Sequence, residues 1–329
     1  MGSITHAVPR PDGDLSVTIV ADDLSGATDS AVACAKRGLN TVVALVDTGG
    51  FGAEAVAFDA DTRRLTGDAA AAETARFVRA HAKARRGLLF KKVDSTLRGH
   101  VGLEIAALLH ALRDLPHCTS GRRTIAVVAP AFPALGRTTL HGRQHLNGVP
   151  LENTELWRLE GLTGSASLLN MMGSSDLGSK LVPIETVRHG AHAIRAAMTD
   201  AADQTDVLVC DAETDQDLAA VAQASLKIGA DLIWVGSAGL IGHLLDAVGV
   251  SRPRANLPQL VTSAGPLLFV VGSQSSVSRR QAERLAAEDV VAFTIEGTML
   301  DDHGAHPTGL AARLSEALAD GNDVLVCQR

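Results

Sequence analysis

Two short segments of the sequence place charged and hydroxyl side chains directly after apolar runs. In the first, V-A-D-D-L-S-G, Asp22 and Asp23 are followed by Ser25 and Gly26. The free N–H groups at the start of a helix attract anions, so this turn could bind a polar ligand. Asp23 or Ser25 alone could equally be a helix cap. Two adjacent carboxylates with a Ser-Gly turn exceed the needs of a cap, and we predict a ligand site here.

The second segment, K-K-V-D-S-T-L-R-G, combines two cations, a carboxylate, two hydroxyls and an arginine. Lys91 and Lys92 should point to opposite faces of a strand because side chains alternate, so only one of them would face the ligand. Arg98 could bind a carboxylate with two parallel hydrogen bonds, and a lysine could neutralise a phosphate. Asp94 and Ser95 complete this candidate set. The alternative is a solvated turn with an incidental ion pair.

A third segment, A-P-A-F-P-A-L-G-R-T-T-L-H-G, also follows an apolar strand. Its two prolines should stiffen a loop and present Arg137 at low entropic cost. His141 and His145 are four residues apart, but Gly142 lies between them and the H-E-x-x-H pattern is absent. No metal site is therefore predicted there.

Two Gly-Ser turns could bind phosphate through backbone N–H groups, because each follows an apolar strand and begins a helix. The first contains Gly236 and Ser237, and the second contains Gly272, Ser273 and Ser275. Either turn taken alone could equally be a tightly packed helix start. Neither turn matches the P-loop or the dinucleotide-binding pattern, so those two classes of site are not supported.

These segments share one pattern of a short apolar strand, a polar or Gly-rich turn and a helix of period near 3.6. The pattern predicts an α/β fold with two domains, each a largely parallel sheet flanked by helices. Carboxyl ends of parallel strands face one crevice, so the polar turns should gather there. The predicted strands lie in the segments VTIVADD, LLFKKVD, TIAVVAPAF, DVLVCDA, LIWVGSAG and LLFVVGSQSS.

The predicted domain boundary is a linker over residues 251–265, which contain two prolines, small polar residues and no clear periodicity. The first domain is then expected over 15–250 and the second over 266–329. Residues 1–14 are expected to be a disordered leader, because prolines and glycine discourage regular structure there.

Composition disfavours several classes of partner. The formal net charge of −7 opposes nucleic-acid binding. No apolar run reaches the roughly 18 residues of a membrane-spanning helix, so no membrane partner is expected. Tyr is absent, which favours a small polar ligand over stacked bases. The four cysteines are far apart and form no C-x-x-C pair, which predicts a cytoplasmic protein.

Taken in order, the motifs A-D-D-L-S-G-A-T-D, K-K-V-D-S-T-L-R-G, P-A-F-P-A-L-G-R-T-T-L-H-G, G-S-A-G-L and G-S-Q-S-S-V-S-R-R-Q resemble the four-carbon acid sugar kinases. The resemblance covers the chain from about Leu15 to Gln281. It implies a first domain that binds threonate, erythronate or a 3-oxo-tetronate, and a second domain that binds ATP with Mg²⁺. Phosphate would then pass to the 4-hydroxyl of the acid. A homodimer is a candidate assembly.

The resemblance also implies roles for individual residues. The acid-rich turn of the family matches Asp22, Asp23, Ser25 and Gly26, its basic turn matches Lys92, Asp94, Ser95 and Arg98, and its nucleotide-binding serine turn matches Gly272 to Ser276, with Ser275 contacting ATP. Gln274 and Ser278 replace the Cys and Thr that are usual in that turn. Family members continue well beyond the end of this sequence, so the second domain is expected to be incomplete.

We expect Arg98 and Lys92 to anchor the carboxylate of the sugar acid, and Asp22 and Asp23 to hold its hydroxyls. Asp23 or Asp94 would help to deprotonate the attacking hydroxyl. An alternative is a protein that binds the sugar acid without turnover. A Rossmann dehydrogenase is disfavoured, because its fingerprint is absent.

Overall fold

The computed structural model describes residues 15–46, 51–81, 87–115, 123–250, 265–273, 276–295 and 309–328. Contacts divide the chain into two compact units, Met1–Asn256 and Leu257–Arg329. The predicted leader, the predicted linker apart from residue 265, and Ser275 lie outside the described residues.

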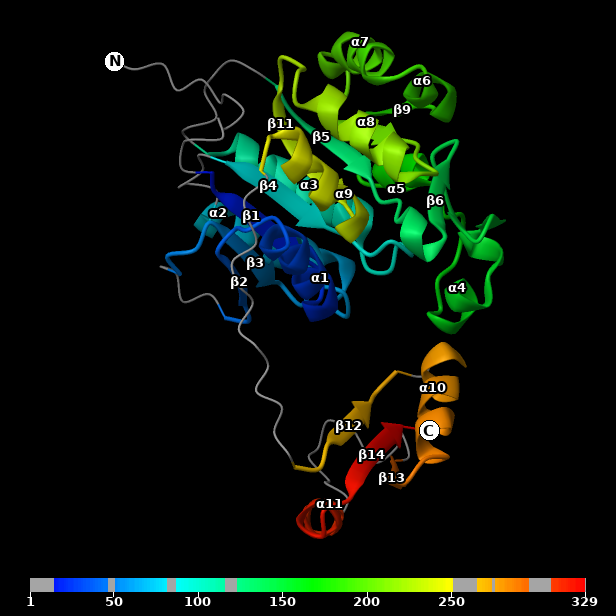
Figure 1. Ribbon diagram of the computed structural model, residues 1–329. Coiled ribbons are helices and arrows are strands. Elements are labelled where there is room, and N and C mark those ends of the chain that lie inside the picture. The colour runs from blue at the N-terminus through cyan, green and yellow to red at the C-terminus, as the bar shows by residue number, and fades with distance from the viewer. Residues whose placement is uncertain are drawn as a thin grey trace. The chain divides into compact units, whose positions relative to one another are not determined.

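The first unit is built on an eight-stranded, entirely parallel sheet in the order β2-β3-β1-β4-β11-β5-β10-β9 (Figure 1). Its strands are β1 (Val17–Ala21), β2 (Thr41–Ala44), β3 (Ala55–Asp59), β4 (Leu88–Lys92), β5 (Thr124–Ala129), β9 (Ser179–Val182), β10 (Val207–Cys210) and β11 (Asp231–Gly236). Every residue of β4, β5 and β10 is buried, because helices cover both faces of the sheet. The predicted α/β class is therefore confirmed.

Helices lie on both faces of the sheet. One face packs against α1 (Leu24–Ala35), α7 (Ala191–Ala202), α8 (Asp215–Ser225) and α9 (Ala238–Ala247), with the short α6 (Ile184–Arg188) beside them. The opposite face packs against α2 (Gly67–His81), α3 (Val101–Arg113) and the short α5 (Leu168–Gly173). Residues 93–100 form a loop between β4 and α3, in which Leu97 has φ +56° and Gly99 has φ +84°.

A small antiparallel sheet of β6 (Arg137–Leu140), β7 (Arg143–Leu146) and β8 (Val149–Pro150) follows β5 and the 3₁₀ turn Pro133–Leu135. The prolines of this segment predicted only a stiff loop here. Two tight turns connect these strands. The turn residues are His141 and Gly142, and then Asn147 and Gly148, and all four have positive φ. Such pairs are typical of two-residue hairpins. The 3₁₀ turn Leu151–Asn153 and α4 (Glu155–Leu159) complete this region.

The second unit contains a three-stranded parallel sheet in the order β12-β14-β13. Its elements are β12 (Leu268–Val271), α10 (Ser276–Ala286), β13 (Val290–Ile295), α11 (Leu310–Ala319) and β14 (Asp323–Gln328). Phe293, Val324 and Val326 form its core, against which Leu310 and Leu314 of α11 pack. Across the described parts of both units, every helix is too short or too polar to cross a bilayer.

Candidate functional site

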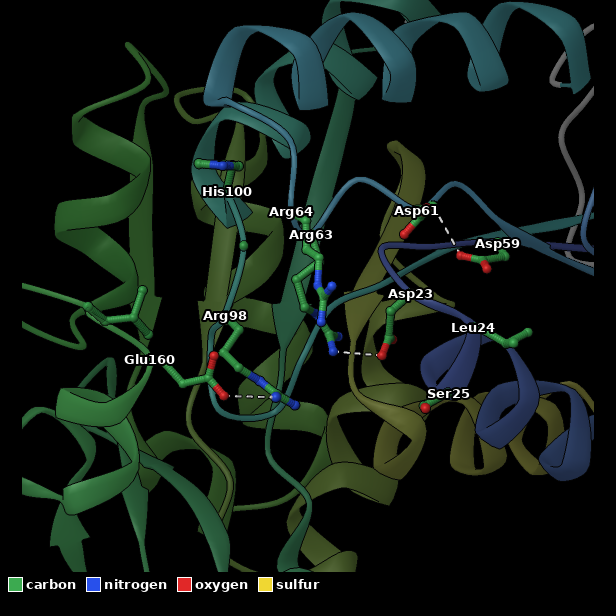
Figure 2. Close-up of a pocket in the computed structure, with 12 residues that line it drawn as sticks. Asp23, Leu24, Ser25, Asp59, Asp61, Arg63, Arg64, Arg98, His100 and Glu160 are labelled. Carbon is green, nitrogen blue, oxygen red and sulfur yellow. Dashed lines mark hydrogen bonds and ion pairs between the residues drawn. The ribbon is translucent and has the colours of Figure 1, made fainter. Parts of the chain in front are cut away.

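The strands β1 and β4 are neighbours in the sheet, with Ala21 in register with Lys92. The helix that follows β1 packs on one face and the helix that follows β4 packs on the other, so the two loops diverge at their carboxyl ends. Ligand crevices of open α/β sheets lie at such a point. A cleft of about 580 Å³ opens here (Figure 2). Its lining residues are Asp23, Leu24, Ser25, Asp59, Asp61, Arg63, Arg64, Arg98, Gly99, His100, Glu160 and Leu162.

Arg63 joins the carboxylates that follow β1. Its Nε donates to Asp22 Oδ2 at 2.8 Å and its Nη1 donates to Asp23 Oδ2 at 2.6 Å, the latter drawn in Figure 2. Asp23 Oδ1 also accepts a hydrogen bond from the N–H of Gly26 at 2.8 Å, so Asp23 caps α1. Arg63 Nη2 lies 3.9 Å from Asp94 Oδ1, at the end of β4. One guanidinium thus connects the ends of three strands.

Asp22 is 2% exposed, and its Oδ1 has no hydrogen-bond partner among the described residues. Burial raises the pKa of this carboxyl, because a charged group loses solvation, although Lys91 and Arg63 oppose the shift. A buried acceptor without a partner is costly, and it marks a position where a donor from a ligand or a water molecule would fit.

Asp94 is held mainly by Arg98. Arg98 Nε donates to Asp94 Oδ2 at 2.8 Å, Arg98 Nη2 donates to Asp94 Oδ1 at 3.2 Å, and the Thr96 hydroxyl donates to the same carboxylate. Burial alone would raise the pKa of Asp94, but the bonds from Arg98 and Thr96 outweigh it and hold that pKa well below its usual range. The remaining nitrogen of Arg98, Nη1, bonds Glu160 Oε1 at 3.2 Å (Figure 2).

Lys91 and Lys92 point to opposite faces of β4. Lys91 is fully buried, and its Nζ lies 2.5 Å from Oε2 of Glu104 in α3. Lys92 lies on the side of α1, where a methyl group on Gly26 would come within 2.6 Å of its Nζ. No hydrogen bond or close ion pair of Lys92 is found within the described ranges. Burial lowers the pKa of Lys92, while Asp22, Asp94 and Asp23 counteract that shift.

Ser95 and Arg137 also lie at this edge of the sheet. Arg137 Nη1 donates to Ser95 Oγ at 2.9 Å, and Gln144 Nε2 donates to Ser95 O at 2.7 Å, so the antiparallel sheet is fastened to the loop after β4. Arg137 Nε is buried and has no partner among the described residues. Burial lowers the pKa of Arg137, against the opposing effect of Asp94.

The two predicted Gly-Ser turns lie in different units. Gly236 is the last residue of β11 beside β4, and Ser237 follows it; a side chain on Gly236 would meet Ala129 O at 2.7 Å. The Ser237 hydroxyl donates to Ala131 O at 2.7 Å and accepts from the N–H of Gly239 at 3.1 Å, as a helix cap does.

Gly272 and Ser273 instead lie in the second unit, between β12 and α10. A side chain on Gly272 would meet no atom within 4 Å among the described residues, so packing does not require a glycine there.

Sequence reasoning missed Arg63, although it lies at the centre of the site. It also missed Asp59, Asp61, Arg64, His100 and Glu160, which line the cleft. A signal for Arg63 was present in the sequence. The apolar run A-V-A-F-D (residues 55–59) is followed by A-D-T-R-R (60–64), so charged residues stand at the carboxyl end of a strand-like segment. Glu160 follows the short helix α4, and no local pattern links it to Arg98.

Known proteins resemble this chain over most of its length. The family of the sugar-binding N-terminal domain matches residues 17–244. A D-threonate kinase of Cupriavidus necator is 38% identical over 325 residues, which is 95% of this chain and 74% of that protein. A D-erythronate kinase of Heliobacterium modesticaldum is 29% identical and covers 85% of this chain, but the match spans only 62% of the relative.

A crystal structure from Bordetella bronchiseptica, described as a domain of unknown function with bound citrate and as a domain-swapped dimer, has a TM-score of 0.60 and 27% identity. The match covers 95% of this chain and 74% of that one. The domain match and the 38% identity to a D-threonate kinase show that this chain belongs to the four-carbon acid sugar kinase family.

Proposed function

We propose that the first unit binds a four-carbon sugar acid in the cleft, and that the protein transfers a phosphoryl group from ATP to the 4-hydroxyl of that acid. The observation that carries the proposal is the convergence of Asp22, Asp23 and Asp94 on Arg63, in a chain of this family. The relatives are named as kinases of D-threonate, D-erythronate and 3-oxo-tetronate, so these three acids are the candidate substrates.

Arg98 and Lys92 would bind the carboxylate, and Asp22 and Asp23 would accept hydrogen bonds from hydroxyls. Asp94 is fully engaged by Arg98 and its pKa is depressed, so it is a poor base and would instead position Arg98. Asp23 therefore takes the proposed role of proton acceptor. Ser25 and Gly26 at the start of α1, with Ser95 and Arg137, would complete the substrate site.

The second unit would bind ATP at the turn of Gly272, Ser273 and Ser275, because backbone N–H groups at the start of a helix suit phosphate. Gly236 and Ser237 in the first unit were predicted to help, and that role also stays a prediction. Among the described residues, no three His, Cys, Asp or Glu side chains gather as a metal site. Mg²⁺ commonly binds through substrate phosphates and one or two carboxylates, which fits an ion that arrives with the nucleotide. Bound Mg²⁺ would neutralise phosphate charge during transfer.

Two measurements on the 329-residue chain test the proposal. A thermal-shift panel of four-carbon sugar acids, with and without Mg-ATP, reports binding of the sugar acid and binding of ATP separately. A coupled assay for ADP then reports turnover. Stabilisation by threonate or erythronate that is lost in Arg98→Ala supports the substrate site, and ADP release supports the kinase. Binding without turnover would favour the alternative of a binding protein, and no response to any of the acids would refute the proposal.

The same proposal includes a cytoplasmic location and a homodimer. Cys34, Cys210 and Cys327 are free thiols in the described parts of the chain, which suits a reducing compartment. The domain-swapped dimer of the Bordetella protein motivates the second expectation. Light scattering after size-exclusion chromatography would give the mass of the particle, and a monomer at micromolar concentration would refute the dimer.

A further inference from the structure

We propose that Glu160 occupies the place of the ligand carboxylate on Arg98, and that a sugar acid binds by exchanging its own carboxylate for that of Glu160. This inference rests on the proposed function, because it takes Arg98 as the anchor of the acid. It adds that affinity at this site is set by competition with a carboxylate of the protein itself.

The hydrogen bonds of Arg98 engage all three of its side-chain nitrogens. Its Nε and Nη2 are bonded to Asp94, at 2.8 Å and 3.2 Å. The nitrogen that Asp94 leaves unused is Nη1, and Glu160 Oε1 accepts from it at 3.2 Å. Glu160 and Arg98 both line the cleft. One N–H of Nη1 and one of Nη2 remain beyond these bonds, so a ligand carboxylate that approaches Arg98 at Nη1 competes there with Glu160.

The two carboxylates on Arg98 differ in how easily they can leave. Asp94 is buried, and it also accepts from the Thr96 hydroxyl and from the N–H of Arg98 at 3.3 Å. The side chains of Glu160 and Arg98 are 40% and 32% exposed. Exposed ion pairs are weak because water screens them and because holding two long side chains costs entropy. Asp94 is thus the fixed partner of Arg98, and Glu160 is the exchangeable one.

The exchange requires only a rotation of the Glu160 side chain. The N–H of Glu160 donates to Leu156 O at 3.1 Å, and the N–H of Leu162 donates to Trp157 O at 3.1 Å. Trp157 is buried in the core of the first unit. The backbone at the rim of the cleft is therefore fixed, and the carboxylate of Glu160 can turn into solvent without moving α4.

The exchange also selects among ligands. A sugar acid replaces the lost Glu160 contact with its own charge, so the number of charges around Arg98 is unchanged. A neutral four-carbon alditol such as threitol supplies no such replacement. Removal of the Glu160 charge should therefore raise affinity for the acid and leave affinity for the alditol as it was.

The test compares Glu160→Gln with Glu155→Gln in the full chain. Glu155 begins the same helix and is exposed, and no ion pair of Glu155 is found within the described ranges, so it controls for the loss of one negative charge near the site. Calorimetric titration with D-threonate and D-erythronate should show a Kd about two- to fivefold lower for Glu160→Gln than for wild type, the weight of an exposed ion pair. Glu155→Gln should bind as wild type does.

An unchanged or higher Kd in Glu160→Gln would overturn the inference and leave the proposed function standing. An equal gain in Glu155→Gln, or an equal gain for threitol, would also overturn it, because the effect would then be a general one of charge. A wild-type chain that binds none of the four-carbon acids would instead refute the proposed function. Circular dichroism of both variants establishes that the comparison is made between folded proteins.

Discussion

Asp22 and Arg63 are bonded to each other twice, once through their side chains and once through their backbones. Arg63 Nε donates to Asp22 Oδ2 at 2.8 Å, and the Arg63 N–H donates to the carbonyl oxygen of Asp22 at 3.1 Å. The loop after β3 is thereby fixed to the end of β1. The guanidinium that neutralises the acid-rich turn also holds that turn in place.

Replacement of Arg63 by Ala should weaken both the site and the fold. Asp22 would lose its partner while buried, so the free energy of unfolding should fall by about 3 kcal/mol, as when a buried pair is broken. Urea denaturation measures this change, and titration with D-threonate should show weaker binding. Arg64→Ala is the control, since its side chain is exposed and the unfolding free energy should change by less than about 0.5 kcal/mol. Equal losses of unfolding free energy in the two variants would contradict the role given to Arg63.

Asp22→Asn should remove a pH dependence from ligand binding. Burial raises the pKa of Asp22 above its ordinary value of 3.8, and Lys91, Arg63 and Lys92 oppose that shift. Only the ionised form is purely an acceptor, so the wild-type Kd for D-threonate should rise as pH falls through the raised pKa. Asp22→Asn should bind more weakly at neutral pH and lack this inflection. Persistence of the same inflection in the variant would assign it to another group, such as the ligand carboxylate.

Asp94→Asn should cost stability at neutral pH and little in strong acid. The pKa of Asp94 is depressed in the folded protein, so its contribution is present above the unfolded value of about 3.9 and is lost as pH falls toward the folded value. Because hydrogen bonds from charged groups are strong, the unfolding free energy of Asp94→Asn should be about 2 kcal/mol below that of wild type at pH 7. The gap between the unfolding free energies of wild type and variant should begin to shrink below about pH 4 and shrink further as pH falls toward the depressed pKa. A gap that stays constant across this range would refute the ionic role of Asp94.

Gly26→Ala should reduce ligand binding without loss of the fold. The new methyl group would lie 2.6 Å from Lys92 Nζ and 2.7 Å from Asp23 Oδ1, so the flexible Lys92 must move away. Loss of one charged contact predicts a Kd for D-threonate about tenfold higher. Gly173→Ala is a matched control, because Gly173 ends α5 and an added methyl group there would meet no atom within 4 Å among the described residues. Tight binding by Gly26→Ala would exclude Lys92 from the site.

The strands that the sequence predicted are those followed by a polar or Gly-rich turn. They are β1, β4, β5, β10, β11 and β12, and their identity as strands is confirmed. The strands β2, β3 and β9 were missed, although each is as long as the predicted β10 or β1, and although charged residues follow β3. The hairpin turn of Asn147 and Gly148 was visible as an N-G pair between strand-like residues and was overlooked.

Part of the site could also be predicted from the polar turns that follow the strands. Asp22, Asp23, Lys92, Asp94 and Arg98 could be grouped because parallel strands end at one edge. Their actual partners, Arg63 and Glu160, depend on how β3 pairs with β1 and on where α4 lies. Such pairing is a tertiary property, and no spacing within one segment encodes it.

The position of β11 in the sheet affects how this protein can fold during synthesis and where it can be truncated. It pairs with β4 on one side and with β5 on the other, yet it is the last strand of the first unit along the chain. A ribosome that has not reached residue 236 has therefore made two separate half-sheets, each with an open edge. We expect fragments that end before Asp231 to aggregate, and the ligand cleft to form only after β11 has joined the two halves.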